Sequence, residues 1–199
     1  MIQVLASRMA GFIVKNDDTA DHEVLTYGFG LILSGLVTYT VVLTSALLLG
    51  LMQEMLVAIF AYIAMRQAIG GVHANSRLVC FITYISTLYL CIFLSFILNV
   101  DIFAVVILYV ISLILLILYA PADTKAQPMV KYRLLRKVAG IAILTVLFCI
   151  STFLLQNQVY ANILLFVSTL MCVLLHPVVY RAYGCETSIL KNKMGGQKS

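Results

Sequence analysis

Charged residues are scarce in this 199-residue chain: only 11% are Asp, Glu, Lys or Arg, whereas 63% are hydrophobic. Average soluble domains have roughly 25% charged and roughly 45–50% apolar residues, so this composition excludes a soluble globule. It equally excludes a disordered or collagen-like chain. The net charge is +5, but in so apolar a chain the basic residues indicate membrane topology rather than binding to nucleic acid.

Tryptophan is absent, so an aromatic belt at the membrane interface would have to rest on the 11 tyrosines. The 5 cysteines are odd in number and mostly lie inside apolar runs, which argues against a secreted disulfide framework. The cysteines and the 3 histidines do not fall in metal-ligand spacing, so we expect neither a metal site nor a cofactor. The first 25 residues also lack the pattern of a signal peptide.

Long apolar stretches dominate what is present. A membrane crossing needs about 20 mostly apolar residues. Residues 24–65 are long enough for a hairpin of two crossings with a turn near Gly50–Glu54, although the second arm is short and could stop within the bilayer. Four more candidates are residues 78–98, 102–119, 138–155 and 160–180. We therefore predict an all-α integral membrane protein with about six transmembrane helices.

Lys and Arg cluster in every second connection, which predicts the orientation. The basic connections are residues 66–77, 121–137 and the tail after residue 180, whereas the connections near residues 50–53, 99–101 and 156–158 contain no Lys or Arg. With six crossings, all basic segments lie on one side. Both termini and the 66–77 loop are therefore expected in the cytoplasm.

The N-terminal residues predict a further helix. Ile2, Leu5, Met9, Phe12 and Ile13 recur at helical spacing, whereas Arg8 and Lys15 lie off that stripe. Such a pattern is typical of an amphipathic helix lying in the cytoplasmic interface. The pattern fits a simple anchor equally well.

Most polar residues have structural explanations. The serines and threonines within the apolar runs suit helix packing, and His176 before Pro177 suits a cap at the membrane interface. No carboxylate lies well inside a predicted span, because Glu54 and Asp101 fall at turns. A proton-coupled or cation transporter therefore lacks its usual sign.

Residues 66–80 form the strongest candidate for a reactive site. Gly70 and Gly71 permit backbone angles that other residues avoid, so they should break the preceding helix. On one unbroken helix, His73 and Cys80 would stand roughly 10 Å apart. A Cys–His catalytic pair must instead lie within hydrogen-bond reach, so the chain would have to fold back between them.

The residues just before Cys80 suit the start of a helix. Asn75 and Ser76 are good N-cap residues, which would place Cys80 in the second turn. The positive end of a helix and the nearby Arg77 would favour a thiolate there. Backbone N–H groups around Asn75–Arg77 could hold an oxyanion, or Asn75 could orient His73. Alone, a cysteine and a histidine remain a weak signal.

At these residues the sequence resembles the accessory gene regulator protein B (AgrB) family, membrane cysteine endopeptidases of Gram-positive quorum sensing. The similarity rests on the pattern Gly70–Gly71, His73 and Cys80, with Arg66 upstream. A second similar segment is residues 120–128, in which two prolines flank a lysine. The family has several consecutive basic residues after that lysine, where this chain has Ala126 and Gln127. The resemblance covers nearly the whole chain.

The resemblance implies a single membrane-embedded peptidase domain over residues 1–199. Residues 1–23 would form the interfacial helix and an acidic connector, residues 24–180 the transmembrane bundle and residues 181–199 a cytoplasmic tail. It implies a bacterial cell membrane location, with the active site near the cytoplasmic face. It also implies a homodimer.

The implied substrate is a short AgrD-type precursor peptide with an acidic C-terminal tail. Cys80 would cleave the bond before that tail through a thioester, with His73 as proton carrier, and the retained segment would cyclise to an autoinducing peptide. Arg66, Arg77, Lys125 and Lys131 are candidates for substrate contacts. The basic loop equally suits topology and contact with anionic lipid. The alternatives are a peptide exporter or channel without proteolytic activity and a small membrane scaffold.

Overall fold

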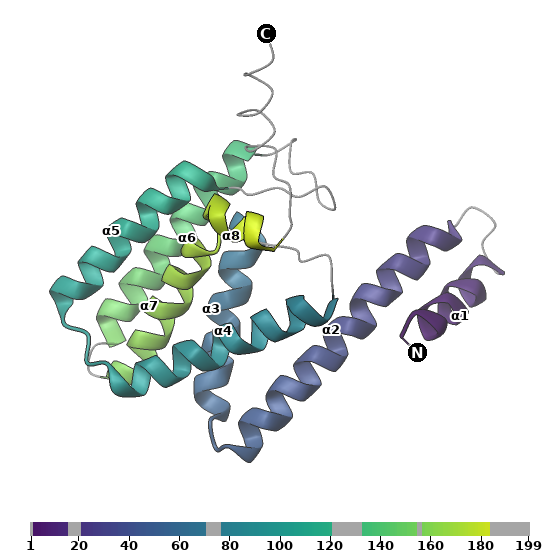
Figure 1. The fold of residues 1–199 in the computed structure, drawn as a ribbon, viewed down its shortest axis with the longest axis horizontal. Coiled ribbons are helices and arrows are strands. Elements are labelled where there is room, and N and C mark those ends of the chain that lie inside the picture. The colour runs from purple at the N-terminus through teal and green to yellow at the C-terminus, as the bar shows by residue number, and fades with distance from the viewer. Residues whose placement is uncertain (1, 16–20, 71–76, 121–132, 155–156, 184–199) are drawn as a thin grey trace, which may run out of the picture. The chain divides into compact units, whose positions relative to one another are not determined.

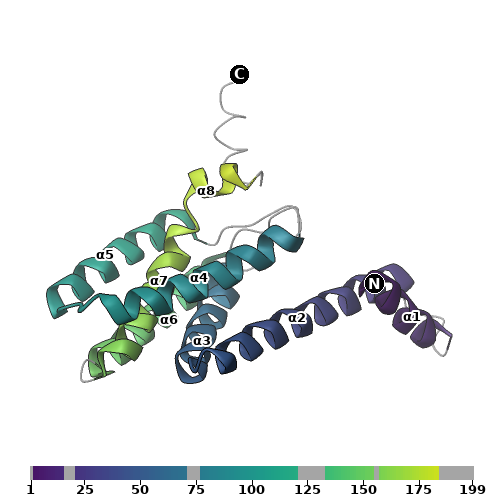
Figure 2. The same ribbon diagram turned by 60° about the horizontal axis from the view of Figure 1, so that its bottom comes forward.

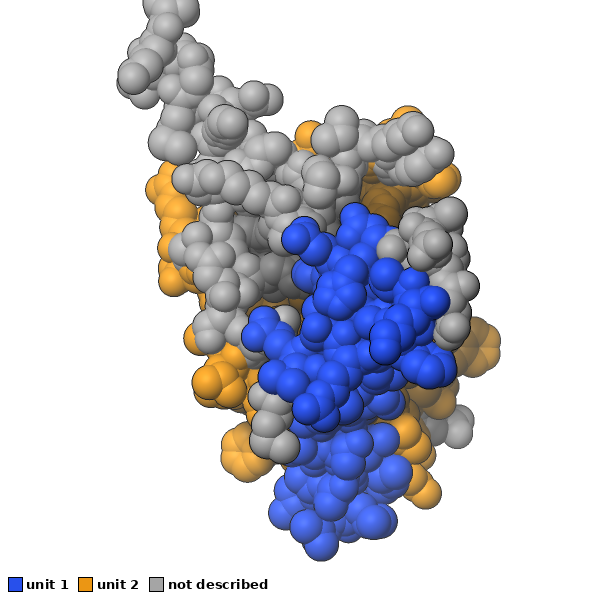
Figure 3. All heavy atoms as spheres, turned by 90° about the vertical axis from the view of Figure 1, so that its right-hand side faces the viewer, with its two compact units in different colours: residues 1–52 blue, residues 53–199 orange. Residues whose placement is uncertain are grey.

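A computed structural model describes residues 2–15, 21–70, 77–120, 133–154 and 157–183. Regular secondary structure in these residues is helical (Figure 1). The chain divides into two compact units, residues 1–52 and residues 53–199, which Figure 3 colours separately. The predicted all-α architecture is confirmed.

Unit 1 contains α1 (Ile2–Val14) and α2 (His22–Leu48), which pack against each other. Ala6 and Ala10 of α1 are fully buried, so small side chains allow the two helices to approach closely. Asp21 caps α2, because its side chain accepts hydrogen bonds from the backbone N–H groups of Glu23 and Val24. A carboxylate at this position offsets the positive end of the helix.

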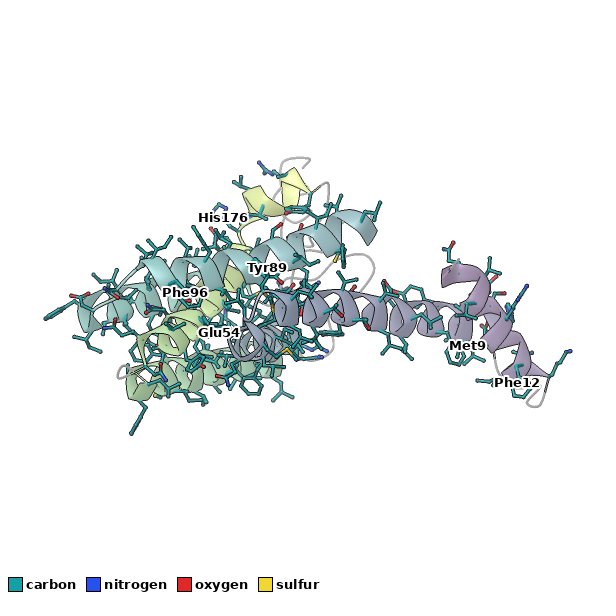
Figure 4. The ribbon with its side chains drawn as sticks, turned by 90° about the horizontal axis from the view of Figure 1, so that it is seen from below. Met9, Phe12, Glu54, Tyr89, Phe96 and His176 are labelled. Atoms are coloured by element: carbon teal, nitrogen blue, oxygen red, sulfur yellow. The ribbon has the colours of Figure 1, made fainter. Side chains whose placement is uncertain are left out.

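Several large apolar side chains of α1 are exposed. Leu5 is 50% exposed and Phe12 is 71% exposed, and the side chains of Met9 and Phe12 extend from the helix in Figure 4. Leu5, Met9 and Phe12 all belong to the predicted apolar stripe, so this part of the stripe is exposed. An interfacial position in the membrane fits this exposure and stays a prediction.

The turn predicted near Gly50–Glu54 is confirmed. α2 ends at Leu48, and α3 (Met52–Ile69) begins four residues later. Gly50 lies between them with a φ of 71°, a left-handed conformation that favours glycine. The backbone N–H of Leu51 closes the turn by donating to the carbonyl of Ala46.

After α3, unit 2 contains four helices of 16 to 21 residues and one of six. They are α4 (Arg77–Ile97), α5 (Ile102–Tyr119), α6 (Arg133–Phe153), α7 (Gln158–Val173) and α8 (Pro177–Ala182). α7 packs against α4, α5 and α6, and α5 also packs against α6 (Figures 1 and 2). A helix that is apolar on all sides is typical of such a central position.

Polar side chains join these helices at several points. Asn162 on α7 donates to the carbonyl of Leu98 at 2.6 Å, which satisfies a backbone group just beyond the end of α4. The hydroxyls of Tyr109 and Thr145 join α5 to α6 at 2.9 Å, and those of Ser112 and Thr169 join α5 to α7 at 3.2 Å. The packing role predicted for Ser112 and Thr145 is therefore confirmed.

Within the described residues, four helices are long and apolar enough to cross a membrane: α2, α4 from Leu78 onward, α5 and α6. α7 is shorter than the run predicted at residues 160–180. It ends at Val173, and His176 caps α8 by accepting from the backbone N–H of Val178. The capping role of His176 is thus confirmed, whereas the count of six crossings stays a prediction.

Charge separates between the two ends of unit 2. Gly140 of α6 lies against Ile69 and Leu116, which places the beginning of α6 beside the last turns of α3 and α5. The described basic residues of unit 2 lie at that end of their helices: Arg66, Arg77, Arg133, Arg136, Lys137 and Arg181. The described acidic residues, Glu54 and Asp101, lie at the opposite end of theirs. We call the first the basic end.

Candidate functional site

The helix break predicted at the diglycine is confirmed. α3 ends at Ile69, and Gly70 follows with a φ of 77°. A side chain would be strained in this left-handed conformation, so glycine allows the chain to leave the helix here. Residues 71–76 lie outside the described residues, and they include three predicted site residues: His73, Asn75 and Ser76. Lys125 and Lys131 also lie outside them.

Cys80 lies at the start of α4. The helix begins at Arg77, as the N-cap residues before it predicted, so Cys80 is its fourth residue. Cys80 is a free thiol of intermediate exposure, whereas Cys91 on the same helix is buried. The beginning of a helix is the end at which backbone N–H groups favour an anion such as a thiolate.

Helical spacing places Cys80 on the same side of α4 as its buried residues, one turn nearer the start of the helix. Tyr84, Thr87, Leu88 and Cys91 follow it on one side of the helix, and all four are buried. Cys80 is therefore at the outer end of the face that α4 turns toward its neighbours. A group reaching Cys80 would approach along the basic end of unit 2.

α3 and α4 are in contact one turn further along α4 than Cys80. The ring edge of Tyr62 faces Tyr84, with ring centroids 4.8 Å apart and planes at 69°. Arg66, one turn further along α3, donates to the hydroxyl of Tyr62 at 3.2 Å and lies over its ring, 5.8 Å from the centroid. Edge-to-face rings and a cation over a ring are both favourable geometries. The contact joins the two helices that flank residues 71–76.

A second contact joins α4 to the segment after α8. The hydroxyls of Thr83 and Tyr183 lie 3.0 Å apart. At the start of α8 lies its cap residue His176, whose ring lies edge to face with that of Tyr119, with centroids 5.2 Å apart. Figure 4 labels His176 at the start of α8. The short helix is therefore attached to the last residue of α5 and to the first turns of α4.

A close approach fixes the last turn of α3. A Cβ atom added to Gly140 would lie 2.6 Å from Cγ2 of Ile69 and 3.5 Å from Cδ1 of Leu116. Ile69 and Leu116 are fully buried. Only a residue without a side chain leaves room for Ile69, which directly precedes the break at Gly70.

This arrangement can support nucleophilic chemistry at Cys80. The described part of the predicted site places Cys80 at a helix start and Arg66 one helix away, linked through two tyrosines. The sequence reasoning missed Tyr62, Tyr84, Thr83 and Tyr183. The available signal was their spacing: Tyr62 precedes Arg66 by four residues and Tyr84 follows Cys80 by four, and polar side chains in apolar helices often mark contacts.

These features define an all-α membrane protein with a free cysteine in the first turn of a candidate span. The family model for accessory gene regulator B matches residues 6–175. Accessory gene regulator protein B of Staphylococcus aureus strain bovine RF122 / ET3-1 is 29% identical over 148 residues, which are 73% of this chain and 75% of that protein. The protein of the same name from strain JH9 is 30% identical, with the same coverage.

The chain therefore belongs to the accessory gene regulator B family, which associates it with the accessory gene regulator quorum-sensing system. The resemblance found in the sequence is thereby confirmed. No solved structure matches the chain.

Proposed function

We propose that this protein is a membrane cysteine endopeptidase that matures a peptide pheromone in the bacterial cell membrane. Cys80 is the nucleophile, and His73 carries the proton. The substrate is a short AgrD-type precursor with an acidic C-terminal tail. The family, together with a free cysteine at the start of a helix, supports this function.

The reaction has two steps. His73 takes the proton of Cys80, whose sulfur attacks the carbonyl carbon of the peptide bond before the tail. The carbon–nitrogen bond breaks, the tail leaves as an amine with the proton from His73, and the remaining peptide stays on Cys80 as a thioester. An internal cysteine or serine of the peptide then attacks that carbonyl, which closes a ring and returns the thiol of Cys80.

The single observation that carries the proposal is the contact between Tyr62 and Tyr84. Because these rings meet at 4.8 Å, α3 and α4 are not parts of one straight helix, along which Tyr62 and Tyr84 would stand roughly 33 Å apart at 1.5 Å per residue. The six residues 71–76 join these two ends. Fully extended residues span at most about 3.6 Å each, so the backbone of His73 stays within about 11 Å of Gly70 and about 14 Å of Arg77. The proposal requires that the side chain of His73 reach Cys80 from within this segment.

A site at the membrane surface suits the second step. Exchange of one thioester for another is close to energy-neutral, so cyclisation succeeds only if water does not reach the thioester first. Cys80 lies at the end of a buried helix face, with tyrosines on both flanks. Asn75 and Ser76, with the first N–H groups of α4, are candidates for holding the oxyanion, and the basic end for attracting the acidic tail.

The test is co-expression of this chain with short precursor peptides encoded near its gene, followed by mass spectrometry. We expect a released tail and an acyl adduct on Cys80. Cys80→Ala and His73→Ala should each abolish tail release while the protein still inserts.

Matched controls are available. Cys149→Ala changes an exposed cysteine of α6, and His22→Ala changes an exposed histidine of α2; both should process the precursor normally. Tail release by Cys80→Ala would refute the proposal. Movement of uncleaved peptide across the membrane by that variant would instead support an exporter.

A further inference from the structure

We propose that Tyr183 is a positioning residue for the reaction at Cys80. By holding α8 against the first turns of α4, it closes one side of the cysteine site and keeps water from the thioester. This inference rests on the proposed function, since it concerns the fate of the same acyl intermediate. It assigns a role to a segment that the catalytic pair leaves without one.

The hydroxyl protons fix the direction of the contact. Thr83 donates its proton to the carbonyl of Val79 at 2.8 Å, and a hydroxyl has only one proton to give. Thr83 must therefore accept the proton of Tyr183, 3.0 Å away. The resulting chain runs from Tyr183 through Thr83 to the carbonyl of Val79, which is the residue before the cysteine.

The geometry of α4 places this chain beside Cys80. Each residue turns about 100° around a helix axis, so Thr83 lies about 60° to one side of Cys80 and Tyr84 about 40° to the other. Tyr84 contacts α3 through Tyr62. Cys80 therefore emerges between two attachments, one to α3 and one to the segment after α8.

α8 is fixed at both ends. At its start, His176 contacts the ring of Tyr119 at 5.2 Å and caps the helix. At its end, Tyr183 binds Thr83. A helix of only six residues gains little stability by itself, so the contacts at its two ends should decide where it lies. Loss of the Tyr183 hydroxyl would free the end nearest to Cys80.

The consequence concerns competition for the thioester. The carbonyl carbon on Cys80 is attacked either by the internal nucleophile, which gives the cyclic peptide, or by water, which gives a linear acid and returns the thiol. Both outcomes release the same tail. A residue that excludes water therefore changes the ratio of linear to cyclic product more than it changes the rate of tail release.

The experiment measures that ratio for a co-expressed precursor that the wild-type chain cleaves, with Tyr183→Phe and Thr83→Val as variants. Each removes one hydroxyl and nearly preserves side-chain size. We expect the linear-to-cyclic ratio to rise about threefold to tenfold in each, the effect of losing one hydrogen bond. Tail release should change by less than about twofold. The double variant should match either single one, because both remove the same contact.

Two control variants remove comparable hydroxyls in unit 1. Thr40→Val removes a hydroxyl that donates to the carbonyl four residues earlier, as Thr83 does, and Tyr27→Phe removes an exposed phenol of α2. Both should keep the wild-type product ratio. As a readout without precursor, N-ethylmaleimide should label Cys80 faster in Tyr183→Phe than in wild type, whereas the buried Cys91 stays unlabelled.

The outcomes separate the two proposals. Unchanged product ratios and labelling rates in both variants, or effects that multiply in the double variant, would overturn the role of Tyr183 and leave the peptidase intact. Tail release by Cys80→Ala would overturn both.

Discussion

Tyr62 on α3 and Tyr84 on α4 meet edge to face with their centroids 4.8 Å apart, and both rings are buried. They lie on the helices that precede and follow the segment containing His73, so their contact joins these two helices. An aromatic pair of this geometry contributes roughly 0.5–1.5 kcal/mol beyond the burial of its surface.

Removal of this ring contact should impair both folding and cleavage. Tyr62→Ala leaves a cavity between the helices and should lower the free energy of unfolding by about 3–5 kcal/mol, with a large loss of tail release per folded molecule. Tyr62→Phe keeps the ring and loses the hydroxyl that accepts from Arg66, so it should retain most activity. Thermal unfolding in detergent and tail release measure the two effects.

The control for this prediction is Phe93→Ala, which removes a ring of α4 that is 62% exposed. It should cost far less stability. Equal losses from Phe93→Ala and Tyr62→Ala would mean that the ring contact has no special role.

Gly140 should be intolerant of even a methyl group. In Gly140→Ala the new Cβ would lie 2.6 Å from Cγ2 of Ile69, so Ile69 must move, and the helix break beside it moves too. Overpacking of this kind costs about 1–3 kcal/mol. We expect lower thermal stability and slower tail release.

A second substitution should relieve the clash. Ile69→Leu has no branch at Cβ, so Gly140→Ala combined with Ile69→Leu should recover part of the lost activity. Gly35→Ala is the matched control, because nothing lies within 4 Å of its added Cβ; it should be neutral or slightly stabilising. If Gly140→Ala were as active as wild type, the close contact between Gly140 and Ile69 would not position the helix break at Gly70.

The sequence was informative where local chemistry decides the structure. Glycines at residues 50 and 70 adopt left-handed conformations at the predicted breaks, and N-cap residues correctly predicted the start of α4. His176 caps a helix as predicted, but the turn beside it divides the apolar run at residues 160–180. Apolar content alone does not distinguish one long helix from two that meet at a proline.

The contacts between distant segments were not predictable. Tyr62 and Tyr84, Thr83 and Tyr183, and Gly140 and Ile69 are each separated along the chain by at least 22 residues. Periodicity shows which face of a helix is apolar, but it does not show which neighbour covers that face. The location of Cys80 at a helix start was therefore accessible from sequence, whereas the residues that flank it were not.

The separation of charge in unit 2 predicts its orientation. Because Lys and Arg favour the cytoplasmic side, Arg181→Cys at the basic end should react with a membrane-impermeant maleimide only after the membrane is permeabilised. Asn99→Cys at the opposite end should react in intact cells. Both positions are exposed, so accessibility within the protein is matched. The reverse labelling pattern would place Cys80 on the outer side and contradict the proposed topology.

The proposed function requires that the chain fold back so that residue 73 reaches Cys80, and a disulfide between these two positions would show this proximity. Two cysteines form this bond only when their Cα atoms come within about 7 Å. Under mild oxidation, His73→Cys should form a disulfide with Cys80, seen by mass spectrometry as a cross-linked peptide. Gln53→Cys at the far end of α3 should not. Failure of His73→Cys to form this bond, while its thiol and that of Cys80 both react with maleimide, would show that the chain does not fold back in this way.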